Sequence, residues 1–352
     1  MFDKEFRLAV AACGWNFTGD GAARIKQLSA DINWDRFVAV VRRHRIEALA
    51  WQCLDQLGIA LPTAIARQLS ADAEAIVGAN LRAAREMVRL RDAFAEAGLP
   101  ILFVKGLTLS ALAYHNPFIK MACDVDILVD ASAIEEAGNL LSSIGYARAP
   151  PLRGTLAAWH RNRKESGWRS ADTALDLHTR LADSLYLIPA IGLDSPRQLV
   201  PIVPGIELET LAPSELFAYL CVHGASSAWF RLKWVTDLAA LLHGLSAQEI
   251  SQLYDHSQQL GAGRTAGQAL LLAERLYGIE LGEALKRHLA GDRTLRALVR
   301  IAVRELTGRT DLKEPTEVRL GTAMIHCSQL LLFPGLRGKA RELHRQLRDI
   351  MT

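Results

Sequence analysis

Hydrophobic residues follow a helical spacing at both ends of the chain. Apolar side chains recur every three or four positions through most of residues 1–99 and again through residues 214–352. In the first part, residues 36–57 are expected to form a helix. In the second part, His223 and Gly224 are expected to end a helix. The pattern therefore predicts an N-terminal and a C-terminal helical lobe.

The middle of the chain, residues 100–188, changes to short alternating segments. Alternation of apolar and polar residues is typical of strands with one covered face, and the intervening stretches keep a helical period. The expected elements are strand 101–105, helix 107–115, strand 124–130, helix 133–144, and strands near 146–149, 166–170 and 174–179. The pattern predicts an α+β protein with a small mixed-sheet core, and the proline-rich residues 189–213 are expected to be a linker.

Local signals are expected to fix the ends of the second core helix. Ser132 and Glu135 have the spacing of a capping box, in which each side chain accepts a hydrogen bond from the other residue's backbone N–H. Gly145 follows the helix and is expected to close it.

Two carboxylates stand on one face of the strand 124–130. Side chains alternate along a strand, so Asp124 and Asp126 share a face while Val125, Ile127 and Val129 share the other. Like charges this close oppose each other's ionisation, and a divalent cation removes that conflict. Mg²⁺ prefers oxygen ligands of this kind. The pair indicates phosphoryl or nucleotidyl transfer, and a solvated edge-strand pair is the alternative.

A third acidic residue follows in the segment 174–178. Leu175 and Leu177 share one face, and Asp176 and His178 share the other. A centre with two metal ions needs a third carboxylate, for which Asp176 is the best candidate. The alternative is the exposed polar face of a hairpin strand. His178 could orient a carboxylate or contact phosphate, or make an ordinary hydrogen bond.

Composition limits the classes of partner and compartment. The 352 residues include 41 basic and 38 acidic side chains, so a net charge of +3 gives no strong signal for nucleic acid. The five cysteines are widely spaced with no Cys-x-x-Cys pair, which favours a reducing compartment. There is no apolar run long enough to span a membrane, and a cytoplasmic protein is expected.

These motifs resemble those of a known family. The strand ending in Lys105-Gly106, the segment Pro117 to Lys120, and Asp124 to Val129 are similar to the corresponding run in the nucleotidyltransferase superfamily with the polymerase-beta-like fold. The closest resemblance is to its bacterial branch of uncharacterised nucleotidyltransferase family proteins. The later Asp176-Leu177-His178 also matches, as do two helical motifs, His223-Gly224 and Arg231 to Asp237. The resemblance covers the chain from about Trp34 to about Leu242.

The resemblance implies a metal-dependent transferase. Such an enzyme moves a nucleoside monophosphate from an NTP to an acceptor hydroxyl or phosphate and releases pyrophosphate. For this chain the expected donor is ATP and the transferred group AMP. Asp124, Asp126 and Asp176 would hold Mg²⁺ or Mn²⁺, and Asp176 would accept a proton. Lys105 and Gly106 would serve the triphosphate, the latter through the N–H groups of the helix that follows it. The alternative for Lys105 is a solvated lysine at the end of the strand.

Two positions depart from the family pattern. An arginine precedes the acidic pair in the family, whereas Lys120 stands here and lacks the bidentate fork. The hydroxyl or second glycine after Gly106 is replaced by Leu107. The departures raise a second hypothesis, a nucleotide-binding or partner-binding module that retains the fold without turnover. A third is a modifier of a protein or peptide natural product. The acceptor, small molecule, peptide or protein, cannot be read from the sequence.

The resemblance also points to His223, Arg231 and Asp237 as groups that hold a base or an acceptor. A surface ion pair between Lys233 and Asp237 is the alternative for that part of the motif. For the acidic pair, substitution of Asp124 or Asp126 by Asn is expected to abolish pyrophosphate release and to leave stability unchanged or raised.

Overall fold

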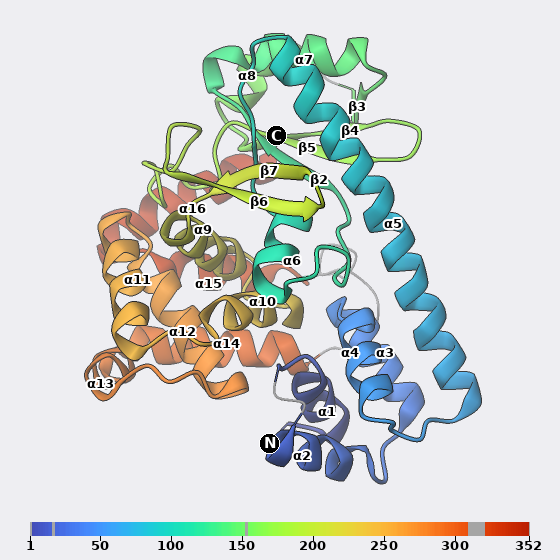
Figure 1. The fold of residues 1–352 in the computed structure, drawn as a ribbon. Coiled ribbons are helices and arrows are strands. Elements are labelled where there is room, and N and C mark those ends of the chain that lie inside the picture. Colours follow the sequence, from blue (N-terminus) through green and yellow to red (C-terminus); the bar gives the residue numbers. More distant parts are fainter. Residues whose placement is uncertain (1, 16–17, 152–153, 309–320, 352) are drawn as a thin grey trace. The chain divides into compact units, whose positions relative to one another are not determined.

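The computed structural model describes residues 2–15, 18–151, 154–308 and 321–351. Their contacts divide the chain into two units, one of residues 1–73 with 220–352 and one of residues 74–219. This division differs from the expected separate lobes at the two ends, because the N-terminal and C-terminal helices contact one another within one unit. Helices α5 (Thr63–Glu96) and α9 (Pro213–Ser226) contribute residues to both units (Figure 1).

The unit of residues 74–219 contains a five-stranded mixed sheet, which confirms the predicted α+β class. The strand order is β1-β2-β5-β4-β3, and only β2 and β5 pair in parallel. The strands are β1 (Leu102–Phe103), β2 (Val125–Leu128), β3 (Ala147–Arg148), β4 (Glu165–Arg169) and β5 (Ala174–His178). The helices beside them are α6 (Leu107–Tyr114), α7 (Ile134–Ser143) and α8 (Leu156–His160).

One face of this sheet is apolar and forms the core of the unit. Val125 and Ile127 of β2 and Leu175 and Leu177 of β5 are at most 3% exposed. They belong to one cluster with side chains of α5 and α7, among them Leu90, Phe94, Ile134, Ala137 and Leu141. Burial of this face leaves Asp126, Asp176 and His178 on the opposite face, because successive side chains on a strand alternate.

The start of α7 differs from the predicted capping box. Asp130 accepts hydrogen bonds from the backbone and hydroxyl of Ser132, and it caps a 3₁₀ turn, η1 (Ala131–Ala133), that precedes α7. Glu135 accepts instead from the backbone N–H of Ala157, at 2.8 Å. The capping-box prediction is therefore wrong, because Asp130 lies two residues before Ser132 and competes for it.

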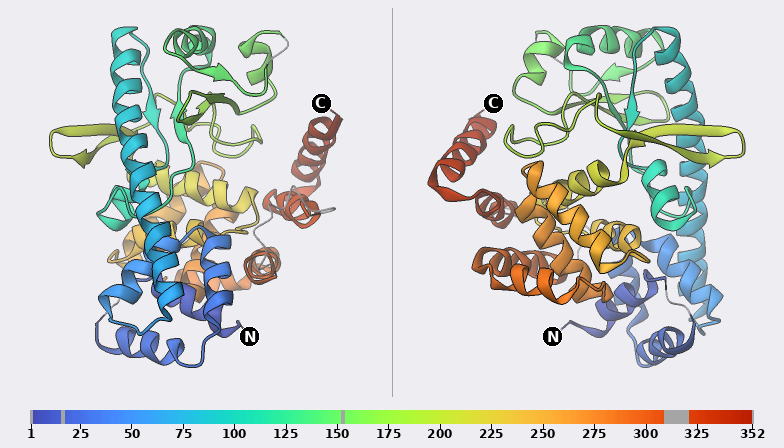
Figure 2. Two further views of the ribbon diagram at one scale, coloured as in Figure 1. Left: turned by 90° about the vertical axis from the view of Figure 1, so that its right-hand side faces the viewer. Right: turned by 60° about the vertical axis from the view of Figure 1, so that its left-hand side comes forward.

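Residues 189–213, predicted to be a linker, contain a two-stranded hairpin. Strand β6 (Arg197–Val203) pairs antiparallel with β7 (Ile206–Leu211), and Figure 2 shows it as a separate ribbon. Pro201, which has no N–H to donate, lies where the register shifts, a position where strands accept proline. Val200 and Leu208 belong to the core cluster of the unit, so the hairpin is part of the packed structure.

In the other unit, every regular element of the described residues is a helix. Its elements are α1 (Lys4–Ala12), α2 (Gly19–Ser29), α3 (Trp34–His44), α4 (Glu47–Gln56), α10 (Leu232–Leu242), α11 (Ala247–Gln259), α12 (Gly263–Tyr277), α13 (Glu283–Gly291), α14 (Arg293–Thr307), α15 (Ala323–Leu332) and α16 (Gly335–Met351). The single helix expected over 36–57 is two helices, because Arg45 adopts a left-handed conformation with φ of 56°. None of the helices in the described part of the chain has the length and apolar character needed to cross a bilayer.

The predicted helix end at His223-Gly224 is also corrected. Helix α9 continues to Ser226, and Gly224 lies inside it. A Cβ at Gly224 would come within 2.4 Å of the Trp229 ring, so the glycine allows this fully buried indole to pack against the helix.

Candidate active site

The polar face of the sheet brings two predicted aspartates side by side. In the parallel pairing of β2 with β5, Asp126 is directly opposite Asp176, and Leu128 is opposite His178. Lys105 reaches the same place because the backbone N–H of Val104 donates to Asp126 O at the end of β1. The positive φ of Gly106, 69°, then turns the chain into α6. The structure thus unites Lys105, Asp126, Asp176 and His178.

Lys105 and Asp126 form a buried ion pair. The Lys105 Nζ lies 2.8 Å from Asp126 Oδ1, and the two side chains are 18% and 3% exposed. Burial alone would raise the pKa of Asp126, but Lys105 and the His178 hydrogen bond hold this pKa well below its usual range. Burial likewise lowers the pKa of Lys105, and Asp126 outweighs it, so the pKa is raised. Lys105 is therefore a charged member of the site and not a solvated residue at a strand end.

His178 connects Asp126 to a carboxylate that the sequence analysis missed. Its Nε2 lies 3.0 Å from Asp126 Oδ1, and because a carboxylate only accepts, this nitrogen carries the donated proton. Nδ1 lies 3.3 Å from Glu165 Oε2 and makes no hydrogen bond among the described residues. Glu165 pairs with Lys164 at 3.0 Å. Burial raises the pKa of Glu165, but Lys164 and His178 lower it further than burial raises it.

Among the residues that the structure describes, Asp176 has no cationic partner comparable to Lys105. Burial raises its pKa to about 7, and the charges of Glu165, Asp124 and Asp126 act in the same direction. Gly167 is opposite Asp176 in the β4 register, and a Cβ there would lie 3.7 Å from Asp176 Oδ1. The same Cβ would lie only 3.0 Å from the backbone oxygen of Ala149, so the close approach of β3 favours glycine here. Asp126 and Asp176, neighbours on one face, thus differ in ease of ionisation.

Asp124 and Lys120 lie on the segment that leads into β2. Asp124 is half-buried directly before the strand, and its charge contributes to the raised pKa of Asp176. Lys120 is 5% exposed. The amide of Asn80 on α5 anchors this segment: its nitrogen donates to the backbone oxygens of Phe118 and Lys120, both at 2.8 Å, and its oxygen accepts from Ala122 N.

His223, Arg231 and Asp237 belong to the helical unit. Arg231 is 4% exposed and donates to the backbone oxygen of Arg43, and His223 packs edge-on against Trp234. Asp237 is 2% exposed, so a surface ion pair with Lys233 does not describe its setting. A role for these three in binding a base or an acceptor remains a prediction.

Four further residues around the site were not found from the sequence. Glu165 and Lys164 lie at the start of β4, Tyr219 is buried within electrostatic reach of Lys105 and Asp126, and Asn80 anchors the loop. Burial raises the pKa of Tyr219 to about 12. The alternation of Glu165, Gly167 and Arg169 could have placed Glu165 on one strand face. Its pairing opposite His178 depends on the register of the β4–β5 hairpin.

The site has the donor set of a cation site. One ligand atom each of Asp126, Asp176 and His178 lies within 4.8 Å of the others. Carboxylates with water suit Mg²⁺ and Mn²⁺. His178 orients Asp126 through its Nε2–H. Burial raises the pKa of Asp176, and so do three neighbouring acids, whose repulsion a cation would relieve. The residues present therefore fit a divalent cation beside Asp176, whose charge Lys105 does not neutralise.

Comparison with known proteins supports the same reading of the chain. The search of curated proteins gives no match. A family model described as uncharacterised nucleotidyltransferase matches residues 30–278, which include the whole sheet, both aspartates of the register pair and the motif from Arg231 to Asp237. Because this match spans well over half of the chain, the protein belongs to the uncharacterised nucleotidyltransferase family.

Proposed function

We propose that this protein transfers a nucleoside monophosphate from an NTP to an acceptor hydroxyl or phosphate and releases pyrophosphate, with ATP as the donor. The observation that carries the proposal is the register pair Asp126–Asp176, placed beside Lys105 and the glycine turn into α6. Family membership supports nucleotidyl transfer in general. The acceptor, whether a small molecule, a peptide or a protein, is left open.

Asp126 and Asp176, with Asp124 beside them, would hold Mg²⁺ or Mn²⁺. Such an ion, when bound, neutralises polyphosphate charge and lowers the pKa of the acceptor hydroxyl. His178 would keep Asp126 oriented through its Nε2–H.

Asp176 is the residue expected to accept the proton of the acceptor hydroxyl. A general base works best when its pKa lies near the working pH, and burial raises the pKa of Asp176 to about 7. Lys105 and Lys120 would neutralise the polyphosphate, as would the N–H groups at the start of α6, where Gly106 supplies no side-chain cap.

One observation favours a second candidate, a nucleotide-binding module without turnover. Lys105 already supplies Asp126 with a positive charge at 2.8 Å. A carboxylate whose charge is balanced by a lysine needs no cation. In this case ATP would bind while pyrophosphate release stays at background.

Two measurements separate these candidates. The first is Mn²⁺ binding by electron paramagnetic resonance, which needs no acceptor. It is expected to be lost in Asp176→Asn and kept in Asp172→Asn, a matched change at an exposed turn before β5. The second is Mg²⁺-dependent pyrophosphate release against a panel of acceptors. ATP binding by calorimetry without cation binding or release in the unsubstituted protein would overturn the transferase proposal in favour of the module.

A further inference from the structure

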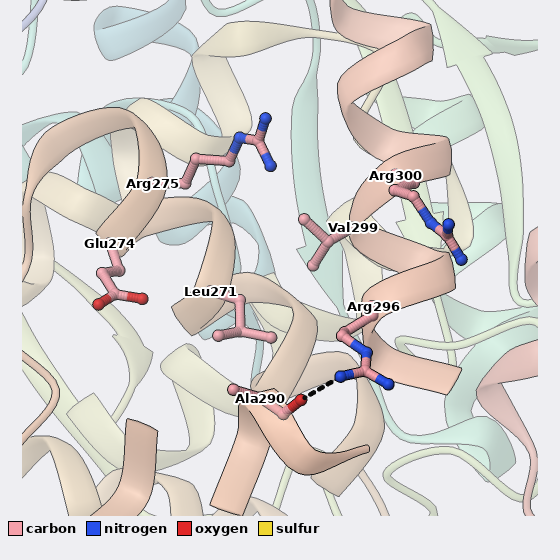
Figure 3. Close-up of a pocket in the computed structure, with 7 residues that line it drawn as sticks. All are labelled: Leu271, Glu274, Arg275, Ala290, Arg296, Val299 and Arg300. Carbon is pink, nitrogen blue, oxygen red and sulfur yellow. Dashed lines mark hydrogen bonds between the residues drawn. The ribbon is translucent and has the colours of Figure 1, made fainter. Parts of the chain in front are cut away.

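A hollow of about 810 Å³ lies within the helical unit, between α12, α13 and α14. Seven residues line it: Leu271, Glu274, Arg275, Ala290, Arg296, Val299 and Arg300. Figure 3 shows Arg275 projecting from α12 toward α14, with Val299 between the two helices. The volume is in the range of pockets that bind small organic molecules.

The charge of this hollow is strongly positive. Three of the lining residues are arginines, and Glu274 is the one carboxylate among them. Glu274 is engaged in an ion pair with Lys286. Within the part of the chain that the structure describes, none of the three arginines forms an ion pair. Their charges are therefore not balanced by the protein's own carboxylates.

The guanidinium groups keep most of their donors available. Arg296 donates one hydrogen bond, to the backbone oxygen of Ala290 at 3.3 Å, and Arg275 lies over the ring of Phe2 at 5.6 Å. Arg300 makes no hydrogen bond to the described residues. Each guanidinium carries five N–H groups in a planar fork that suits phosphate oxygens.

We infer that this hollow binds a small organic phosphate, with its phosphate oxygens on Arg275, Arg296 and Arg300. Grouping three cations without a counter-charge is unfavourable until an anion joins them. Arginine in place of lysine favours bidentate contacts with phosphate. Leu271 and the mostly buried Val299 give the organic part an apolar surface.

The size of the charged region favours a small ligand over a nucleic acid. Helix α14 also carries Arg293 and Arg304, which are exposed like Arg296 and Arg300 but do not line the hollow. The whole chain has a net charge of only +3. A polyanion lying along α14 would use all four of its arginines, whereas a ligand in the hollow would use only Arg296 and Arg300.

The test is calorimetric titration of the full-length protein with inorganic pyrophosphate in the presence of EDTA. The unsubstituted protein is compared with the double variant R296Q/R300Q and with the matched double variant R293Q/R304Q, which removes equal charge from the same helix. The affinity for pyrophosphate is expected to fall about tenfold or more in R296Q/R300Q, because charge-assisted hydrogen bonds are lost. In R293Q/R304Q it should change less than about twofold.

Three results would overturn the inference. No measurable binding, or binding unaffected by R296Q/R300Q, would show that pyrophosphate does not occupy the hollow. Equal loss in both double variants would indicate diffuse attraction of the kind a nucleic acid uses. Tighter binding of citrate than of pyrophosphate would replace phosphate by carboxylate as the ligand class. The readout contains no turnover, so it stands or falls separately from nucleotidyl transfer.

Discussion

The two aspartates of the register pair should respond to the same substitution with opposite changes in stability. Asp126→Asn removes the partner of Lys105 and the charge that His178 Nε2 faces. Asp176→Asn removes a carboxylate whose neighbours are mainly other acids. The expectation from the sequence, that loss of either charge of the 124–126 pair relieves repulsion, therefore fails for Asp126, because its nearest charged group is a lysine.

The magnitude for Asp126→Asn follows from burial. Removing one partner of a buried ion pair costs about 3–5 kcal/mol, because the other charge stays buried. Lys105 is 18% exposed, and the Asn oxygen can still accept one hydrogen bond, which places the expected loss near the lower end, about 3 kcal/mol. The pKa of Asp126 is held well below its usual range, so this loss should be the same at about pH 8 and about pH 5.

Asp176→Asn should stabilise the protein, and only at higher pH. Burial raises the pKa of Asp176 from 3.8 to about 7, so ionisation above pH 7 opposes folding by at most about 4 kcal/mol. Part of this energy belongs to the neighbouring acids, and we expect a gain of about 2 kcal/mol at about pH 8. The gain should shrink as the pH falls through 7 and vanish only below about 3, where Asp176 is protonated in both folded and unfolded chains.

The assay must report on the sheet itself, because a chain of two units need not unfold in one step. Hydrogen exchange followed by mass spectrometry, on peptides that contain β2 and β5, measures the free energy of opening there. Asp172→Asn serves as the exposed control and should change nothing. Unchanged or raised protection in Asp126→Asn, or lowered protection in Asp176→Asn at about pH 8, would refute the charge assignment of the site.

Three other predictions concern residues away from the register pair. Burial raises the pKa of Glu47 from 4.5 to about 7. Glu47→Gln should therefore raise the free energy of unfolding, measured by urea denaturation, by about 3 kcal/mol at about pH 8 and by almost nothing near pH 4. An equal effect at both pH values would contradict this. Gly224→Ala should lower the melting temperature through a clash with Trp229 that costs about 1–3 kcal/mol, whereas Gly78→Ala, with its nearest contact at 3.6 Å, should not. Asn80→Ala should cost about 3 kcal/mol, because three hydrogen bonds are lost, one buried and two partly buried. It should also speed hydrogen exchange in residues 116–124, and unchanged exchange there would count against an anchoring role.

The strands of the site were predictable because each carries its own alternation. Residues 124–129 and 174–178 show which side chains share a face, and the structure confirms strands at both places. That these two strands are neighbours in the sheet cannot be read from either segment alone. Parallel strands are joined by long connections, so nothing local states that Asp126 is opposite Asp176.

The features that the sequence does not predict also depend on contacts between separate segments of the chain. Glu165 was overlooked because its role depends on hairpin register, and Lys105 was left undecided because its counter-charge lies on another strand. The prolines of residues 189–213 indicate a linker, whereas the apolar residues between them form the strands of a hairpin. Pro201 is tolerated there at a register shift.

The two aspartates differ in pKa, and this difference gives them different chemical roles. Asp126 is fixed as an anion by Lys105 and His178, whereas burial raises the pKa of Asp176 to about 7. Where two carboxylates have pKa values pushed apart, the environment separates a permanent charge from a proton acceptor. Lys105 is the largest of the influences that lower the pKa of Asp126, and burial is the largest of those that raise the pKa of Asp176. A sheet face with both carboxylates equally paired would lack this division, whatever cation it bound.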